Sequence, residues 1–143
     1  MILDDTLVLS DAQAITADAA STNIIDLGAA GTAYGHSAAV RRDVGIGTHI
    51  PLLLIVTEAF NTLTSLTVIV QVDNDAAFGS PKEVARSAAI PLASLVAGYT
   101  FPFPAELPEG TDERYLRLYY DVTGSNPSTG KVTAAVVAGR QTN

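Results

Sequence analysis

Residues 115–122 read Tyr115-Leu116-Arg117-Leu118-Tyr119-Tyr120-Asp121-Val122, a clean alternation of apolar and polar side chains. This period of two is typical of a β-strand with one buried face. The inward side chains are Leu116, Leu118, Tyr120 and Val122, and the outward ones are Tyr115, Arg117, Tyr119 and Asp121. We therefore predict a strand with one face in a core and one face at the surface.

Other segments carry strand patterns of the same kind. Residues 50–56 form a continuous apolar run, which predicts a strand buried on both faces. Residues 83–86 and 99–103 are weaker strands, and Pro102 assigns the second to an edge or bulge because proline lacks the backbone donor. Two further strands, 66–72 and 131–138, each place one apolar set on a common face: Leu66, Val68, Val70 and Val72, and Val132, Ala134, Val136 and Ala138.

Turn-forming residues separate these segments at the spacing of short strands. They supply a positive φ, a preset φ or a side-chain hydrogen bond to the backbone. They fall at residues 73–75, 79–81, 108–110 and 124–127. Short strands at this spacing predict an all-β protein, with a sandwich or barrel of antiparallel strands.

The first third of the chain has a less regular pattern. Ser10-Asp11-Ala12-Gln13 fits a helix capping box, which predicts a helix to about Ala20. The β-branched residues that follow favour extended chain instead, so we expect a strand or extended arm over 13–16 and a strand over 23–27. Residues 28–47 are rich in Gly and Ala and predict a long loop. Loops of this length are usually functional or mobile.

The composition limits the classes of function. A chain of 143 residues, 48% of them hydrophobic, predicts one domain over 1–143, with a possible N-terminal arm at 1–9. The net charge of −7 argues against nucleic-acid binding, which needs a basic surface. The longest apolar run is far shorter than the ~20 residues of a membrane span, and the acidic start does not fit a signal peptide. We therefore expect neither a nucleic-acid partner nor a membrane partner.

The residue types that usually carry chemistry are poorly placed for it. Cysteine is absent, and His36 and His49 lack the His-x-His pair and following Glu of a cupin-type metal site. Residues 73–75 lack the spacing of an EF-hand loop, although a weak calcium site in a loop stays open. The glycines at 28–31 and 45–47 lead into no helix that could receive a phosphate. We therefore expect a protein that is not an enzyme, with no catalytic residue, no metal site and no cofactor.

Two sets of residues are candidates for contact with another protein. Arg41, Arg42 and Asp43 concentrate charge in the long loop, and the interpretations are a docking loop or a solvated turn. Tyr115, Arg117 and Tyr119 share the outward face of one strand. That face could line a subunit contact or bind a sugar, although the chain has no Trp to stack on a sugar. The alternative is that a neighbouring loop covers it.

An ordered set of short segments carries a resemblance to a known family. The segments are 10–16, 21–28, 42–47, 88–91, 95–99, 114–120 and 129–134. Taken together and in this order, they resemble the capsid cement (decoration) proteins of tailed phages related to the Bordetella phage cement protein. The resemblance covers nearly the whole chain. The sequence departs from the family in a longer stretch, Gly28 to His36, ahead of Arg41.

The resemblance implies a jelly-roll-like antiparallel β-sandwich on the outer surface of a capsid. The implied partner is the major capsid protein of an HK97-type shell, together with further copies of the chain in a dimer or trimer. The protein would lie on the virion surface, and in the host cytoplasm during assembly. It would stabilise the shell by contact. The alternative function is a carbohydrate-binding or adhesion β-sandwich module on a virion or cell surface.

Overall fold

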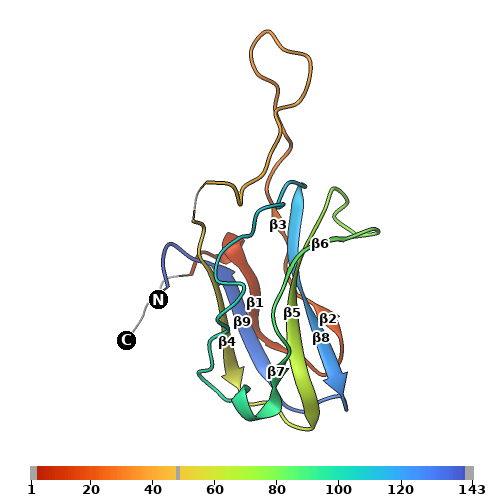
Figure 1. Cartoon of the computed structure of the whole chain (residues 1–143), viewed down its shortest axis with the longest axis vertical. Coiled ribbons are helices and arrows are strands. Elements are labelled where there is room, and N and C mark those ends of the chain that lie inside the picture. The colour runs from red at the N-terminus through yellow and green to blue at the C-terminus, as the bar shows by residue number, and fades with distance from the viewer. Residues whose placement is uncertain (1–2, 48, 141–143) are drawn as a thin grey trace.

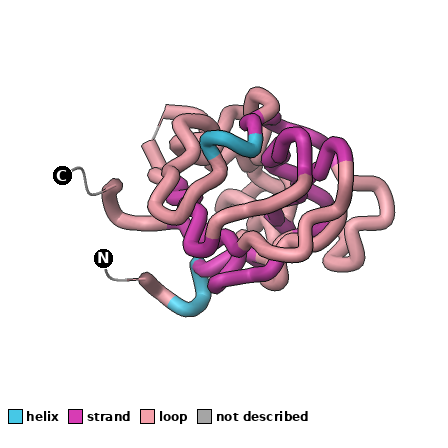
Figure 2. The backbone as a smooth tube through the Cα atoms, turned by 90° about the horizontal axis from the view of Figure 1, so that it is seen from below, coloured by secondary structure: helices cyan, strands magenta, loops and turns pink. Residues whose placement is uncertain are grey.

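The computed structural model describes residues 3–47 and 49–140. Strands and loops make up nearly all of this part, and the helical turns η1 (Asp5–Leu7) and η2 (Leu92–Ser94) are short (Figure 2). The strands follow the chain as β1 (Val8–Ala14), β2 (Ala19–Ala20), β3 (Ile25–Asp26), β4 (Leu52–Glu58), β5 (Leu63–Asp73), β6 (Lys82–Arg86), β7 (Ile90–Pro91), β8 (Tyr115–Gly124) and β9 (Lys131–Val136). The all-β prediction is confirmed.

The strands form two antiparallel sheets that face each other (Figure 1). The first sheet has the order β1-β9-β4, and the second has the order β2-β8-β5-β6, with β3 on β8 and β7 on β5. Residues 99–107 run along the open edge of β4, where the amide of Phe101 donates to Leu54 at 3.0 Å. With this edge counted, each sheet has four positions, so the predicted jelly-roll-like sandwich is confirmed.

The core lies between the two sheets. Leu66, Val68, Val70 and Val72 of β5 are all fully buried there, as their alternation predicts. From β8, Leu116, Leu118 and Tyr120 join them, while Val122 is only half-buried near the end of its strand. The alternation therefore identified the inner face of both central strands correctly.

Strand β4 is buried on both faces, as predicted from its continuous apolar run. Leu52, Leu54 and Val56 enter the core, whereas Leu53 lies on the outer face of its sheet. There Leu53 packs in a second cluster with Val8, Ala135 and Val137. The first sheet thus has apolar side chains on both of its faces.

One hydrogen bond joins the two sheets through the core. Tyr120 of β8 is fully buried, and its hydroxyl lies 2.7 Å from the hydroxyl of Ser10 in β1. Ser10 gives its single proton to Oε1 of Gln13 at 2.7 Å, so Tyr120 is the donor to Ser10. This contact fixes the position of β1 against the opposite sheet.

Several predicted boundaries are wrong. The strand predicted at 50–56 spans Leu52–Glu58, and Ala138 is exposed beyond the end of β9. Residues 99–103 lie at an edge, as Pro102 predicted, but they pair there through one isolated bridge at Thr100 and do not form a continuous strand. The N-terminal arm can reach only as far as Leu7, since Val8 and Leu9 are buried in β1. Its residues 1–2 lie outside the described residues.

The helix suggested by Ser10-Asp11-Ala12-Gln13 is absent, because these residues belong to β1. Ser10 and Gln13 do contact each other, but across a bulge in which Ala12 has φ 42°. The Gln13 side chain also donates to the carbonyl of Ala20 at 2.8 Å. The strand expected at 13–16 therefore starts earlier, and the one at 23–27 is reduced to β3.

Candidate contact surfaces

A long loop separates β3 from β4, as predicted, and part of it projects from the sandwich (Figure 1). We call residues 29–40 the arm. The arm doubles back on itself through a bridge between Thr32 and Ala39, and the amide of Val40 donates to the carbonyl of Gly31 at 2.8 Å. Every residue from 31 to 40 is exposed, and Tyr34 is fully so. The arm contains no Asp, Glu, Lys or Arg.

The chain entering the arm is held by an ion pair. Arg114, just before β8, donates to both carboxylate oxygens of Asp26, at 2.9 and 2.7 Å. Asp26 also accepts the amide of Gly28 at 2.7 Å. The hydrogen bonds from Arg114 and Gly28 hold the pKa of Asp26 at about 2, below its ordinary value of 3.8. This bidentate pair fixes the direction in which the loop leaves β3.

A first prediction concerns this carboxylate. The pKa of Asp26 is depressed in the folded chain, so its anchoring is present above about pH 4 and is lost as pH falls towards 2. In the Arg114→Ala variant we expect the pKa of Asp26 to return towards its ordinary value, measured by NMR titration of the carboxyl carbon. A Lys131→Ala control, whose partner is Glu58 in the other sheet, should leave the titration unchanged. An unaltered titration in Arg114→Ala would contradict the assignment.

Asp43 holds the other end of the loop. One carboxylate oxygen accepts the amide of Gly45 at 3.1 Å, and the other accepts the amide of Gly110 at 2.8 Å. The amide of Val44 donates to the carbonyl of Thr111 at 3.2 Å. Asp43 was a candidate contact residue, but both of its oxygens serve the loop itself. Its role in this structure is to fasten the loop to the 108–111 turn.

Arg41 and Arg42 remain available on the surface. Arg41 is exposed and Arg42 is half-buried, and both line an open hollow of about 840 Å³ at the base of the arm. Asp112 and Arg114 lie in the same hollow. Asp112 is paired with Lys82 at 2.7 Å, Asp26 with Arg114, and Asp43 with two backbone amides, so the acids of this region already have partners. The two arginines can therefore offer their charge to another molecule.

The face of Tyr115, Arg117 and Tyr119 points outward from β8 as predicted, but all three side chains are half-buried. The guanidinium of Arg117 lies 4.2 Å from the ring centre of Phe78, which belongs to the loop after β5. Its Nε donates to Gln71 at 2.8 Å. A neighbouring loop thus covers part of this face, which was the alternative interpretation. Arg117 is already engaged within the chain.

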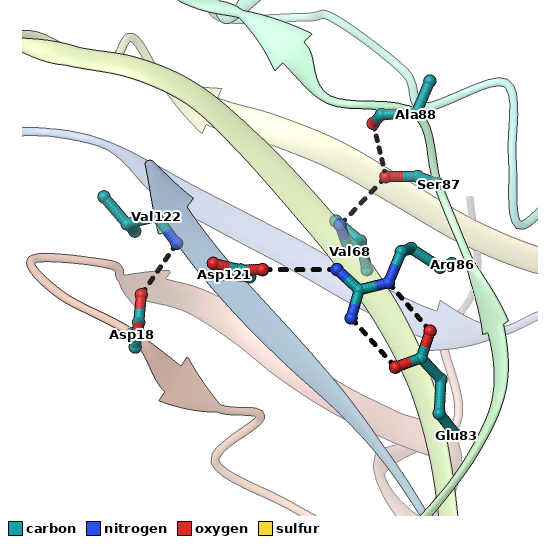
Figure 3. A network of polar contacts seen from close by, with 8 residues as sticks. All are labelled: Asp18, Val68, Glu83, Arg86, Ser87, Ala88, Asp121 and Val122. Atoms are coloured by element: carbon teal, nitrogen blue, oxygen red, sulfur yellow. Dashed lines mark hydrogen bonds and ion pairs between the residues drawn. The ribbon is translucent and has the colours of Figure 1, made fainter. Parts of the chain in front are cut away.

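A polar network crosses the same sheet beside this face (Figure 3). Arg86 of β6 donates to both oxygens of Glu83, at 2.8 and 2.9 Å, and to Asp121 of β8 at 3.3 Å. It therefore bridges β6 and β8 across β5. All three side chains are partly exposed, so this network organises the surface more than it stabilises the fold.

The histidines and the acidic turn have local roles. Nδ1 of His36 accepts the amide of Ala38 at 3.2 Å, and His49 pairs with Glu106 at the surface. Asp73 accepts the amides of Asp75 and Ser80, at 2.9 and 3.0 Å, which shapes the turn. Over residues 3–47 and 49–140, no group of three or more metal-ligating side chains comes together. No helix in the same part of the chain is long and apolar enough to cross a membrane.

A model of the Bbp16 family, a Bordetella phage protein family, matches residues 9–136. The chain belongs to the Bbp16 family. The match runs from Leu9 in β1 to Val136 at the end of β9, and it includes the arm and both candidate surfaces. The resemblance to phage proteins is thereby confirmed at the level of the family. A search of curated proteins gave no match.

The sequence of this Bbp16 family member did not predict which residues anchor the long loop between β3 and β4. Asp26 and Arg114 are 88 positions apart, and Asp43 and Gly110 are 67 apart. Nothing in either local pattern indicates its partner. Tyr34 could have been noticed as a lone aromatic side chain in a stretch without charge, but its full exposure depends on how the loop projects.

Proposed function

We propose that this chain is a capsid cement protein that binds the outer surface of an HK97-type shell. The observation that carries the proposal is its membership of a phage protein family over residues 9–136. The fold supports it, because a rigid two-sheet sandwich with a projecting loop is suited to surface contact. In this proposal the protein catalyses no reaction and needs no cofactor.

The proposed mechanism is stabilisation by mass action. A subunit that binds the assembled shell but not its dissociated parts shifts the equilibrium towards the shell, by about 2.7 kcal/mol per site when its concentration is 100 times Kd. Many sites on one shell add their contributions. Self-association into a dimer or trimer would let one particle hold several sites at once, which raises the avidity.

The sugar-binding alternative is less well supported, because the side chains of Tyr115, Arg117 and Tyr119 are half-buried. A sugar site needs open aromatic faces, whereas Phe78 covers Arg117 and Arg114 lies 4.9 Å from the ring centre of Tyr115. The capsid function therefore fits this face better than sugar binding does.

The function is tested by sedimentation with bare shells assembled from the cognate major capsid protein. We expect the purified chain to pellet with the shells to saturation and to raise the temperature at which they dissociate. A chain that stays in the supernatant at micromolar concentration, and leaves the shells unchanged, would reject the proposal.

A second prediction concerns Arg41 and Arg42, which we propose to pair with carboxylates of the shell. Ion pairs at an interface rim contribute about 0.2–1 kcal/mol each, so the Arg41→Ala/Arg42→Ala variant should bind roughly 2- to 30-fold more weakly. Its affinity should also depend less on salt, because charges have been removed from the interface.

The matched control is Lys131→Ala/Arg140→Ala, which changes the net charge equally. Lys131 is paired with Glu58 in the first sheet, and Arg140 donates to the carbonyl of Phe101 at 2.9 Å. We expect this control to bind shells as the wild type does. Equal binding and equal salt dependence of the Arg41/Arg42 variant and the wild type would show that the two arginines face away from the shell.

A further inference from the structure

We infer that the arm anchors the subunit to the shell by inserting its uncharged tip, around Tyr34, into an apolar crevice between neighbouring capsid subunits. The inference rests on the proposed function and names the surface and the partner chemistry through which it acts.

The arm is exposed although it lacks acidic and basic side chains. All residues from 31 to 40 are exposed, yet the stretch contains no Asp, Glu, Lys or Arg. The described part of the chain has seven exposed large hydrophobic side chains, and three of them lie in the long loop between β3 and β4, namely Tyr34, Val40 and Ile46. Tyrosine is enriched among the residues that dominate protein interfaces, because it buries a large area with few rotatable bonds.

The base of the arm is anchored to the sandwich, whereas its tip projects away from the sandwich. Asp26 with Arg114 fixes the chain on one side, and Asp43 with Gly110 fixes it on the other. Half of the arm, about six residues at about 3.3 Å each, can extend by at most about 20 Å. An element of this length can cross the joint between two neighbouring subunits while the sandwich rests on one of them.

The charges around the arm favour the shell over a second copy of this chain as its partner. The hollow that a second copy would offer has apolar side chains such as Val40 and Ile46, but it also contains Arg41 and Arg42. An uncharged tip seated there would take these two charges out of water without giving them a partner. The arm instead presents an uncharged end followed by two arginines at its base. That order fits an apolar crevice with an acidic rim, in which Arg41 and Arg42 meet the rim as the tip enters.

The structure also shows how to remove the arm without disturbing the body. The amide of Val40 donates to the carbonyl of Gly31, and the same hydrogen bond joins the two residues that flank a two-residue hairpin turn. Replacing residues 32–39 by Asn-Gly should close the chain with a two-residue hairpin turn. A smaller change is Tyr34→Ser. Its control is Val96→Ser, which removes another exposed apolar side chain. Val96 follows η2, and the η2 turn lies at the end of the sandwich opposite the arm (Figure 1).

The experiment measures binding to bare shells by sedimentation, with light scattering on the free proteins. We expect the armless variant to bind at least a hundredfold more weakly and Tyr34→Ser about tenfold more weakly, while Val96→Ser binds as the wild type and all keep their melting temperature.

If the wild type binds and the armless variant binds equally well, the arm is not the anchor and the cement function still stands. If the wild type itself fails to bind, the proposed function is rejected. If losing the arm changes the oligomeric state, its occupant is a second copy and the inference is overturned.

Discussion

Replacing Tyr120 by alanine is expected to lower the free energy of unfolding by about 3–5 kcal/mol. Tyr120 is the largest of the fully buried side chains and lies between the two sheets. Its removal leaves a cavity that the surrounding side chains of the core cannot fill without moving whole strands. It also breaks the hydrogen bond to Ser10, which joins β8 to β1. Urea denaturation of the wild type and the variant measures the difference.

The Tyr120→Phe variant separates the hydroxyl from the ring. The core stays filled, and the loss is one buried hydrogen bond, worth about 1 kcal/mol. Ser10 keeps its hydrogen bond to Gln13 in this variant. Because Ser10→Ala and Tyr120→Phe each remove the same Ser10–Tyr120 hydrogen bond, the double variant should lose less stability than the sum of the two single losses. The control is Tyr34→Phe, which removes a hydroxyl from a fully exposed ring and should not change stability. Equal losses in Tyr120→Phe and Tyr34→Phe would contradict the role given to the Ser10 contact.

The same residue should give the protein an alkaline limit. Burial raises the pKa of Tyr120 above its ordinary value of 10.0. The unfolded chain therefore releases this proton first as pH rises, so the stabilisation is complete below about pH 10 and declines above it. Tyr120→Phe should have a flatter dependence of stability on pH above that value. Parallel curves for the two proteins would mean that Tyr120 ionises as readily in the folded state.

The strands that could be predicted from the sequence are those whose environment differs between their two faces. The alternation in β8 follows from burial on one side, and a shift of one residue would reverse it. In β5 the outward side chains Thr67 and Ile69 are buried as well, so its inner face was identified by the apolar side chains at every second position. The continuous apolar run of β4 was informative for the opposite reason. Its sheet has apolar side chains on both faces, with Leu53 in the outer cluster.

The features that could not be predicted from the sequence depend on contacts between residues far apart in the chain and on local backbone geometry. The capping-box pattern of Ser10 and Gln13 is a real contact, but the bulge at Ala12 places it in a strand. The sequence left open whether a loop covers the face of Arg117, and Phe78 covers it from a loop that no periodicity describes. The loop containing Arg41 and Arg42 was recognised, whereas its anchors lie in distant turns of the sequence.

The clearest single test of that anchoring is Gly45→Ala. A Cβ at Gly45 would lie 1.9 Å from the carbonyl oxygen of Pro108, which is a backbone atom and cannot rotate away. The loop must therefore separate from the 108–111 turn, with loss of the Asp43–Gly110 and Val44–Thr111 hydrogen bonds. We expect the free energy of unfolding to fall by about 1–3 kcal/mol. Hydrogen exchange of the Gly110 amide should become faster.

The consequence for function should be larger than the loss of stability. The loop base sets the direction of the arm and of Arg41 and Arg42, so a displaced base should weaken shell binding at least tenfold, which corresponds to about 1.4 kcal/mol. The matched control is Gly139→Ala, where an added Cβ meets nothing within 4 Å. We expect Gly139→Ala to fold and bind as the wild type does. If Gly45→Ala speeds exchange at Gly110 yet binds shells with wild-type affinity, the loop has moved without consequence, and the contact surface must lie elsewhere on the sandwich.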